Sequence, residues 1–465
     1  MLFSESIFLF GFLPAVLFCY YVLSRKSRLW QNILLTLASL FFYAWGETLF
    51  VFMMVLSITV NWFCALKVDK HRDNAKKTKA IIILMLAYNL SIFFVFKYLT
   101  FTLFNINSIF GTSISYPSIA LPIGISFFTF QAISYVIDVY RQKGEVQRNI
   151  MNVALYISFF PQLIAGPIVR YQTVADQINN RKETFDSFAD GCVRFMVGLG
   201  KKVIIANNLA LIAEQAFAST ELTVLMAWLG IIAFTLQIYF DFSGYSDMAI
   251  GLGKMFGFHF LENFNYPYIS KSITEFWRRW HISLGSWFRD YIYFPLGGSR
   301  VDGKFRLVFN LFVVWLLTGI WHGANWTFIV WGLMYFALIA FEKLTGLEKK
   351  IGWFAYIYTM LFVMIGWVLF NSSSIAYAGY YISCMFGFGT IGLYDVASLA
   401  TILYNYGYFI LAFIFAVPIV ECINKKCGNS KIWTTVKSVA IVCIFLISIS
   451  FIVKGSYNPF IYFNF

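Results

Sequence analysis

Two histidines in apolar surroundings are the residues of this chain best suited to acid–base chemistry. His322 stands in LLTGIWHGANW, at the end of an apolar run that begins at Leu307. An ionisable ring at membrane depth is costly, so it indicates either a function or a specific partner. A buried imidazole is expected to be neutral at pH 7, which is the state that a general base requires. The alternative is a histidine that a neighbouring group satisfies within the core.

His281 lies in the largest polar stretch within the apolar framework, in ISKSITEFWRRWHISLGSWFRDYIYFPLGG. Ser272 and Glu275 form the pattern of a capping box, which predicts the start of a helix. Continued at 100° per residue, this helix would gather its aromatic side chains on one face and place His281 at the border of that face. The later PLGG predicts its end.

Three arginines of the same stretch, Arg278, Arg279 and Arg289, fall on the other side of the expected helix. They fit an interfacial helix whose guanidinium groups meet lipid phosphates. They also fit a cytoplasmic entrance for an anionic molecule such as a coenzyme A thioester, since guanidinium binds phosphate well. The residue pattern leaves both interpretations open.

Three further side chains are candidates for substrate contact. Asp241 lies in an apolar span, where a carboxylate must be paired or hydrated, so we expect either an ion pair, for example with an arginine of the polar stretch, or a role in the site. Asn325 would lie near the imidazole of His322 if one helix contained both, but GAN could end that helix. Trp321 is as consistent with packing as with substrate contact.

Several common catalytic centres have no matching pattern in the sequence. It contains no G-x-S-x-G elbow, no Walker A loop and no complete G-x-G-x-x-G, which argues against serine-hydrolase, nucleotide-hydrolase and dinucleotide-binding functions. The seven cysteines are scattered, so we expect neither a disulfide framework nor a metal site.

The composition identifies an all-α, polytopic membrane protein. The 465 residues are 60% hydrophobic and only 12% charged, and apolar stretches long enough to span a bilayer recur from end to end. We expect about ten to twelve membrane-embedded helices in one integral-membrane domain over residues 1–465. Pro161 and Pro167 interrupt an apolar stretch and predict a bent or re-entrant element.

The net charge of +13 is best explained as a topology signal. Lys and Arg concentrate in alternate short loops, so nucleic acid is not an expected partner, and the lipid bilayer is. By the positive-inside rule, the N-terminus and the C-terminus should both face outward.

Four segments, in this order and spacing, resemble the membrane-bound O-acyltransferase (MBOAT) family: SFFPQLIAGPIVRY, IYFDFSGYSDMAIGLGKMFGF, FNYPYISKSITEFWRRWHISLGSWFRDYIYFPLGG and LTGIWHGANWTFIVWG. The resemblance is greatest to a bacterial branch that O-acetylates alginate and peptidoglycan. It covers nearly the full chain, with a motif core at about 155–342.

The resemblance implies a function and a site. The near-invariant histidine of the family maps onto His322 and the second motif position onto His281. Members of this branch take an acyl group from a cytoplasmic donor, here acetyl-CoA, and pass it across the bacterial inner membrane. A periplasmic acetyltransferase partner then modifies an extracytoplasmic glycan. No bound cofactor is implied.

Three other functions are compatible with parts of the sequence. A D-alanyl transfer protein of teichoic acid synthesis would take its acyl group from a carrier protein. A non-enzymatic transporter could use Asp241, Asp247 and His322 as proton sites. A membrane scaffold for polysaccharide export would depend on no single histidine.

Overall fold

The described residues form helices joined by turns and loops, with no strand among them. The computed structural model describes residues 1–117, 119–347, 350–428, 430–455, 457–459 and 461. In these ranges, nine helices are long and apolar enough to cross a membrane, and two shorter apolar helices, Phe8–Leu23 and Ile125–Tyr140, accompany them. The expectation of an all-α multi-pass membrane protein is therefore confirmed, while the number of ten to twelve embedded helices stays a prediction.

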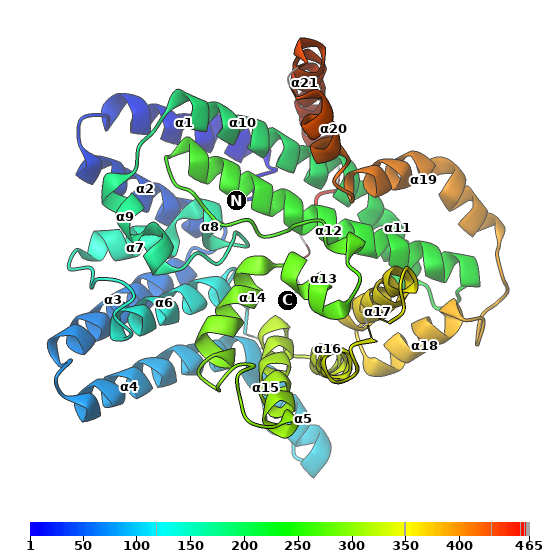
Figure 1. The fold of residues 1–465 in the computed structure, drawn as a ribbon, viewed down its shortest axis with the longest axis horizontal. Coiled ribbons are helices and arrows are strands. Elements are labelled where there is room, and N and C mark those ends of the chain that lie inside the picture. Colours follow the sequence, from blue (N-terminus) through cyan, green and yellow to red (C-terminus); the bar gives the residue numbers. More distant parts are fainter. Residues whose placement is uncertain (118, 348–349, 429, 456, 460, 462–465) are drawn as a thin grey trace. The chain divides into compact units, whose positions relative to one another are not determined.

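The chain divides into two compact units (Figure 1). Unit 1 comprises Met1–Phe195 and Met248–Leu261, and unit 2 comprises Met196–Asp247 and Glu262–Phe465. The single integral-membrane domain over residues 1–465 stays a prediction.

Unit 1 is built from the first helices of the chain. In order they are η1 (Phe8–Phe12), α1 (Leu13–Phe18), η2 (Cys19–Leu23), α2 (Arg28–Ala44), α3 (Phe50–Lys70), α4 (Ala75–Phe93), η3 (Phe94–Tyr98), α5 (Leu99–Phe110), α6 (Ile125–Tyr140), α7 (Ile150–Ser158), α8 (Phe160–Leu163) and α9 (Tyr171–Asn180). Two long helices, α10 (Phe185–Gly200) and α12 (Val224–Met255), contribute residues to both units.

Unit 2 contains the remaining helices, including those that hold both histidines. They are η4 (Lys201–Ala206), α11 (Asn207–Ala218), η5 (Pro267–Ile269), α13 (Ile273–Arg279), α14 (Ile282–Phe288), η6 (Arg289–Tyr293), α15 (Lys304–His322), α16 (Trp326–Thr345), α17 (Phe354–Asn371), α18 (Ile375–Met385), α19 (Val396–Phe415), α20 (Ile419–Cys427) and α21 (Lys431–Val453).

The proline-containing stretch of unit 1 is interrupted, as its sequence predicts. Helix α7 ends at Ser158, Phe159 leaves the helical conformation, and Pro161 occupies the first turn of the four-residue helix α8. Proline is tolerated there because the first backbone N–H groups of a helix have no intrahelical acceptor. All four residues of α8 are buried, so protein surrounds this irregular backbone.

The prediction of one continuous helix from the capping box at Ser272 to PLGG is wrong. Helix α13 does begin as predicted, with the Ser272 Oγ accepting a 3.0 Å hydrogen bond from the Glu275 N–H. It ends at Arg279, and His281 adopts a left-handed conformation with φ of 45° before α14 begins.

The cause is a pair of backbone hydrogen bonds with a distant loop. The N–H of Asn265 donates to the carbonyl of Arg279, and the N–H of Ile282 donates to that of Asn263, both at 2.9 Å. These bonds engage backbone groups on both sides of His281. The faces expected from one continuous helix at 100° per residue therefore do not apply across His281.

Helices α15 and α16 form an antiparallel hairpin that holds His322 at its turn. Their close approach depends on two glycines. A Cβ on Gly319 would lie 2.6 Å from the Phe328 carbonyl oxygen, and one on Gly332 would lie 2.5 Å from that of Trp315. Small residues allow helix backbones to approach in membranes, so these glycines fix the position of the end of α15.

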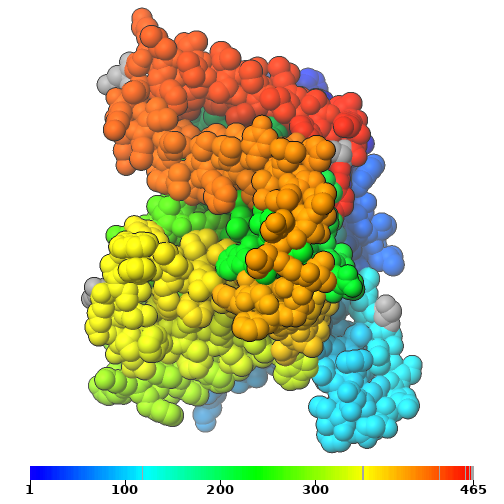
Figure 2. Space-filling model, turned by 90° about the vertical axis from the view of Figure 1, so that its right-hand side faces the viewer, coloured from blue at the N-terminus to red at the C-terminus, as the bar shows by residue number. Residues whose placement is uncertain are grey.

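The loop between α18 and α19 packs against the start of α12. The N–H groups of Val224 and Leu225 donate to the carbonyls of Gly392 and Leu393, at 3.1 and 2.9 Å. Figure 2 shows the orange side chains of the α18–α19 segment beside green side chains on this face. The start of α12 is thereby tied to the later part of unit 2.

Candidate functional site

His322 is the last residue of α15 and is almost fully buried, with an exposed fraction of 5%. Aromatic rings surround it. The ring centroids of Trp331 and Phe370 lie 4.8 and 5.3 Å from that of His322, and both rings stand nearly perpendicular to it. The imidazole therefore sits in a low-dielectric environment, where hydrogen bonds to a reacting group are strengthened.

His281 is buried between α13 and α14, with a defined partner for one ring nitrogen. Its Nδ1 lies 3.2 Å from Oδ1 of Asn263, an oxygen that also accepts hydrogen bonds from the Ser283 Oγ at 2.8 Å and the Ser283 N–H at 3.2 Å. Two donors therefore identify this atom as the amide oxygen. Since an amide oxygen only accepts, Nδ1 of His281 must carry the proton.

The same burial keeps this ring uncharged. Desolvation lowers the pKa of His281 to about 3, because burial disfavours the imidazolium. A neutral ring with its proton on Nδ1 has a lone pair on Nε2. His281 can therefore accept a hydrogen bond through Nε2 but cannot donate one there.

One indole links the two histidines. The ring centroid of Trp321 lies 6.2 Å from that of His281 and 4.9 Å from that of His322. Three residues that the sequence singles out as candidates are therefore neighbours in unit 2.

A carboxylate that was not a sequence candidate holds α13 in place. Glu342 of α16 is 1% exposed and accepts hydrogen bonds from the N–H groups of Ile273 and Thr274, at 2.7 and 2.9 Å. A negative charge at a helix N-terminus is favourable because the first N–H groups lack intrahelical acceptors. This contact anchors the segment that leads to His281 against the helix that follows His322.

The three arginines are more exposed than the histidines. Arg278 and Arg289 are exposed; Arg289 pairs with Asp290 at 3.0 Å, and Arg279 pairs with Glu275 at 2.8 Å. Both ion pairs join residues that are close in the sequence. They do not test whether the three arginines bind the acyl donor, so that role stays a prediction.

Asp241 is paired, but its partner is a lysine. The prediction that an arginine of the polar stretch pairs with Asp241 is wrong. The Asp241 carboxylate lies 2.7 Å from Nζ of Lys202, and both side chains are 3% exposed. Asp247 pairs in the same way with Lys201 at 2.7 Å. Both lysines belong to η4, and no pattern in the sequence predicts that η4 lies beside α12.

Asn325 begins the second helix of the hairpin. Helix α15 ends at His322, so the two residues do not share a helical face, and GAN ends the helix as its glycine suggests. The Asn325 side chain instead caps α16 by accepting a 3.1 Å bond from the Thr327 N–H, and it donates to the Ser373 carbonyl at 3.0 Å.

Asn325 also lines a cavity of about 350 Å³ in unit 2. Phe370, which contacts the His322 ring, lines it as well. The cavity therefore lies one aromatic side chain away from His322. No sequence pattern indicated it, because its walls come from segments far apart in the chain.

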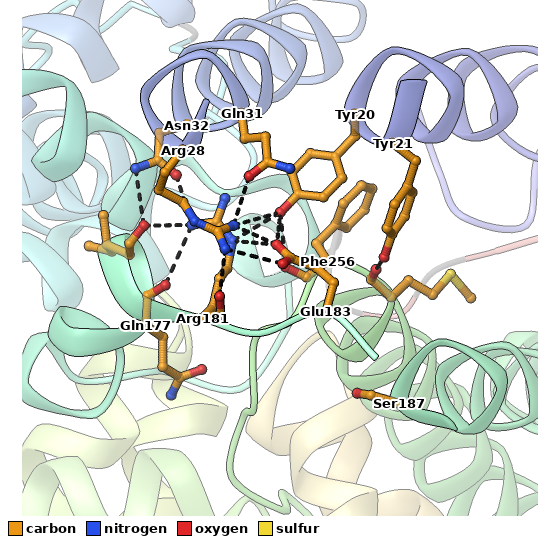
Figure 3. Close-up of polar contacts among 12 residues, drawn as sticks. Tyr20, Tyr21, Arg28, Gln31, Asn32, Gln177, Arg181, Glu183, Ser187 and Phe256 are labelled. Atoms are coloured by element: carbon orange, nitrogen blue, oxygen red, sulfur yellow. Dashed lines mark hydrogen bonds and ion pairs between the residues drawn. The ribbon is translucent and has the colours of Figure 1, made fainter. Parts of the chain in front are cut away.

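Unit 1 contains a buried polar cluster that sequence reasoning also missed. Figure 3 shows Tyr20, Arg28 and Arg181 converging on Glu183. Glu183 accepts hydrogen bonds from Tyr20 and Arg28, and Nε of Arg181 lies 3.5 Å from its carboxylate. Arg181 is completely buried and also donates to Asn32 at 2.7 Å. The cluster ties the start of α2 to the α9–α10 connection.

Known proteins match this chain over its whole length. The "Probable alginate O-acetylase AlgI" of Pseudomonas putida is 41% identical over 100% of both chains. The "Peptidoglycan O-acetyltransferase" of Helicobacter pylori is 34% identical over 100% of this chain and 98% of its own. The "Teichoic acid D-alanyltransferase" of Bacillus subtilis is 31% identical over 54% of this chain and 68% of its own.

The family model gives the same assignment. The model of the membrane-bound O-acyltransferase family matches residues 141–387, which are more than half of the chain and include both histidines. The chain belongs to the membrane-bound O-acyltransferase family and is a multi-pass membrane acyltransferase.

Proposed function

We propose that this acyltransferase moves an acetyl group from cytoplasmic acetyl-CoA to a hydroxyl of an extracytoplasmic polysaccharide. The two relatives matched over the full chain have names that specify O-acetylation, of alginate and of peptidoglycan. The observation on which the proposal rests is the pair of buried histidines on either side of Trp321.

His322 is the proposed general base. A thioester is already activated, so the enzyme must deprotonate the acceptor hydroxyl and hold both reactants in line. As the hydroxyl oxygen attacks the thioester carbonyl, His322 takes its proton. When the tetrahedral intermediate collapses, the C–S bond breaks and the proton passes to the departing thiolate, which restores neutral His322.

His281 is the proposed positioning group for the acceptor. With its proton on Nδ1, His281 can accept a hydrogen bond from the acceptor hydroxyl through Nε2, whereas it has no N–H at Nε2 to donate to the carbonyl oxygen of the thioester. Orienting the acceptor hydroxyl therefore fits the hydrogen-bond geometry of His281 better than orienting the thioester.

Trp331 is the proposed donor to the developing oxyanion. Its indole is fully buried, its ring lies 4.8 Å from that of His322, and its Nε1 has no hydrogen-bond acceptor among the described residues. Because the buried indole is already held in place, its N–H group can stabilise the oxyanion without rearrangement of the site during the reaction.

The distribution of basic residues supports transfer from the inside outward. Lys304 and Arg306 lie at the start of α15, and Lys343 lies near the end of α16. The positive-inside rule assigns these ends to the cytoplasm, and the hairpin turn that follows His322 to the outer side. On this basis we propose the bacterial inner membrane as the location, with both termini outward.

The exposed arginines and a partner complete the proposed pathway. Arg278, Arg279 and Arg289 are available to bind the phosphates of the donor from the cytoplasm. A periplasmic acetyltransferase is the proposed partner in delivering the acetyl group to the glycan.

The proposal is tested by supplying purified protein with radiolabelled acetyl-CoA and a candidate glycan, with and without a periplasmic partner. His322→Ala should abolish labelling, while the matched control His259→Ala, at an exposed position of unit 1, should retain it. Undiminished transfer by His322→Ala would reject the mechanism. Labelling from a D-alanyl carrier protein, but not from acetyl-CoA, would reject the donor.

A further inference from the structure

The cavity beside His322 has the lining of a carbohydrate site. Residues with polar side chains from four separate segments line it: Glu214, Gln237, Asn325, Asn371, Ser372 and Ser373. Aromatic rings of Phe234, Phe328 and Phe370 complete much of the wall. Amides and hydroxyls match the hydroxyls of a sugar, and apolar faces match its C–H surfaces. The volume of about 350 Å³ is in the range of a small-molecule site.

Gln237 is the residue that most clearly requires a ligand. It lies on α12, is only 5% exposed and lines the cavity, yet its Oε1 accepts no hydrogen bond from any residue that the structure describes. Leaving a buried carbonyl oxygen without a hydrogen-bond donor is destabilising. A hydroxyl group in the cavity would supply the missing donor.

The ring of Phe370 separates the cavity from His322. Phe370 lines the cavity and contacts the His322 ring at 5.3 Å, and Phe328 packs on Phe370 at 5.0 Å. The hairpin turn through Asn325 forms another part of the wall. A bound molecule would therefore lie one aromatic side chain away from the proposed general base.

The charge of the lining indicates what kind of sugar fits. Glu214 is the one charged residue among the described lining residues, and no Lys, Arg or His is present there. The nearby ammonium of Lys202 is neutralised by Asp241 at 2.7 Å. A sugar carboxylate would meet a like charge without a counter-ion, which is unfavourable in a partly desolvated site.

We infer that this cavity binds a neutral sugar unit of the acceptor glycan, with Gln237 accepting a hydrogen bond from one of its hydroxyls. This inference rests on the proposed function, because it assigns the acceptor to the same site. It selects an uncharged sugar, such as an N-acetylhexosamine, over a uronate.

The test compares two acceptors and two matched variants of the full-length protein. The acceptors are a neutral N-acetylhexosamine oligosaccharide and an oligouronate of equal length. The variants are Gln237→Leu and Gln131→Leu; Gln131 is also a buried glutamine but belongs to α6 in unit 1. Measurements are acetyl transfer, hydrolysis of labelled acetyl-CoA without acceptor, and direct binding of each oligosaccharide by calorimetry.

Wild type should bind and acetylate the neutral oligosaccharide in preference to the oligouronate. Gln237→Leu should weaken binding of the neutral oligosaccharide about tenfold, the size expected for one hydrogen bond. Gln131→Leu should match wild type, and acetyl-CoA hydrolysis should be equal in all three proteins. Unchanged binding in Gln237→Leu or equal use of the oligouronate would overturn the inference.

The two proposals fail in distinguishable ways. If no protein hydrolyses or transfers acetyl from acetyl-CoA, the proposed donor or reaction is rejected. The binding measurement still decides the assignment of the cavity, because it needs no acyl donor.

Discussion

The side chain of Asn263 determines which nitrogen of His281 carries the proton. Its Oδ1 accepts from Ser283 and lies 3.2 Å from the His281 Nδ1, so the ring presents an unprotonated Nε2. This contact joins the loop before η5 to the left-handed residue between α13 and α14. The same loop supplies the backbone hydrogen bonds that interrupt the helix at this point.

Asn263→Ala should reduce activity without unfolding the protein. Without the fixed tautomer, the His281 ring can present an N–H to the acceptor, so we expect kcat to fall about 10²-fold, at the lower end of effects on general acid–base groups. KM for acetyl-CoA should not change. Steady-state kinetics with the melting temperature as control checks this, and a change confined to the melting temperature would contradict a positioning role.

The low pKa of His281 has a consequence for the pH profile of the enzyme. With a pKa near 3, His281 remains neutral from pH 5 to 9, so it cannot produce an inflection in that range. Any limb in the plot of log(kcat/KM) against pH between pH 5 and 9 must therefore arise from the titration of another group. His281→Asn should lower the rate but leave the position of the limb unchanged, whereas disappearance of the limb would show that His281 titrates.

Trp331→Phe should remove an oxyanion donor while retaining an aromatic ring. Loss of one such donor typically costs 10²–10³ in kcat. Trp315→Phe is the matched control, since Trp315 is also a buried indole, packs near Trp331 with ring centroids 6.3 Å apart, and has no proposed role in transfer. Equal losses in single-turnover acetyl transfer by the two variants would indicate that Trp331 acts through packing alone.

Local patterns in the sequence predicted much of the site. The capping residues gave the start of α13, the apolar run gave the helix that ends at His322, and the family motifs singled out both histidines. The break at His281 was not predictable, because its cause lies in hydrogen bonds to Asn263 and Asn265. Residues whose role depends on contacts between distant segments, such as Glu342 and Gln237, were missed for the same reason.

Asp241 is expected to act as a structural anchor and not as a donor-binding group. Its carboxylate pairs with Lys202 and accepts a 3.0 Å hydrogen bond from the Ile461 N–H, and Ile461 lines the cavity beside His322. Asp241→Leu should lower the melting temperature because it leaves the buried Lys202 charge uncompensated, a cost of about 3–5 kcal/mol.

The double variant Asp241→Leu/Lys202→Met should recover most of that stability, because both charges are then removed. KM for acetyl-CoA should remain that of wild type in both proteins. A raised KM in the double variant, with stability restored, would instead support donor binding by Asp241.

The polar cluster of unit 1 should make the protein sensitive to acid. Burial raises the pKa of Glu183, but hydrogen bonds from Arg28 and Tyr20 lower it by more, so its net pKa lies below the ordinary value. A carboxyl group with a depressed pKa in the folded state contributes stability that is present above its unfolded pKa of about 4.3 and is lost as pH falls through the folded value.

Glu183→Gln should lower the melting temperature at pH 7, and the difference from wild type should shrink as the pH is lowered towards 3. Glu221→Gln, at an exposed carboxylate, is the control and should match wild type at both pH values. A Glu183→Gln deficit that stays constant between pH 7 and 3 would mean that the cluster stabilises unit 1 through shape and neutral hydrogen bonds, and not through the charge of Glu183.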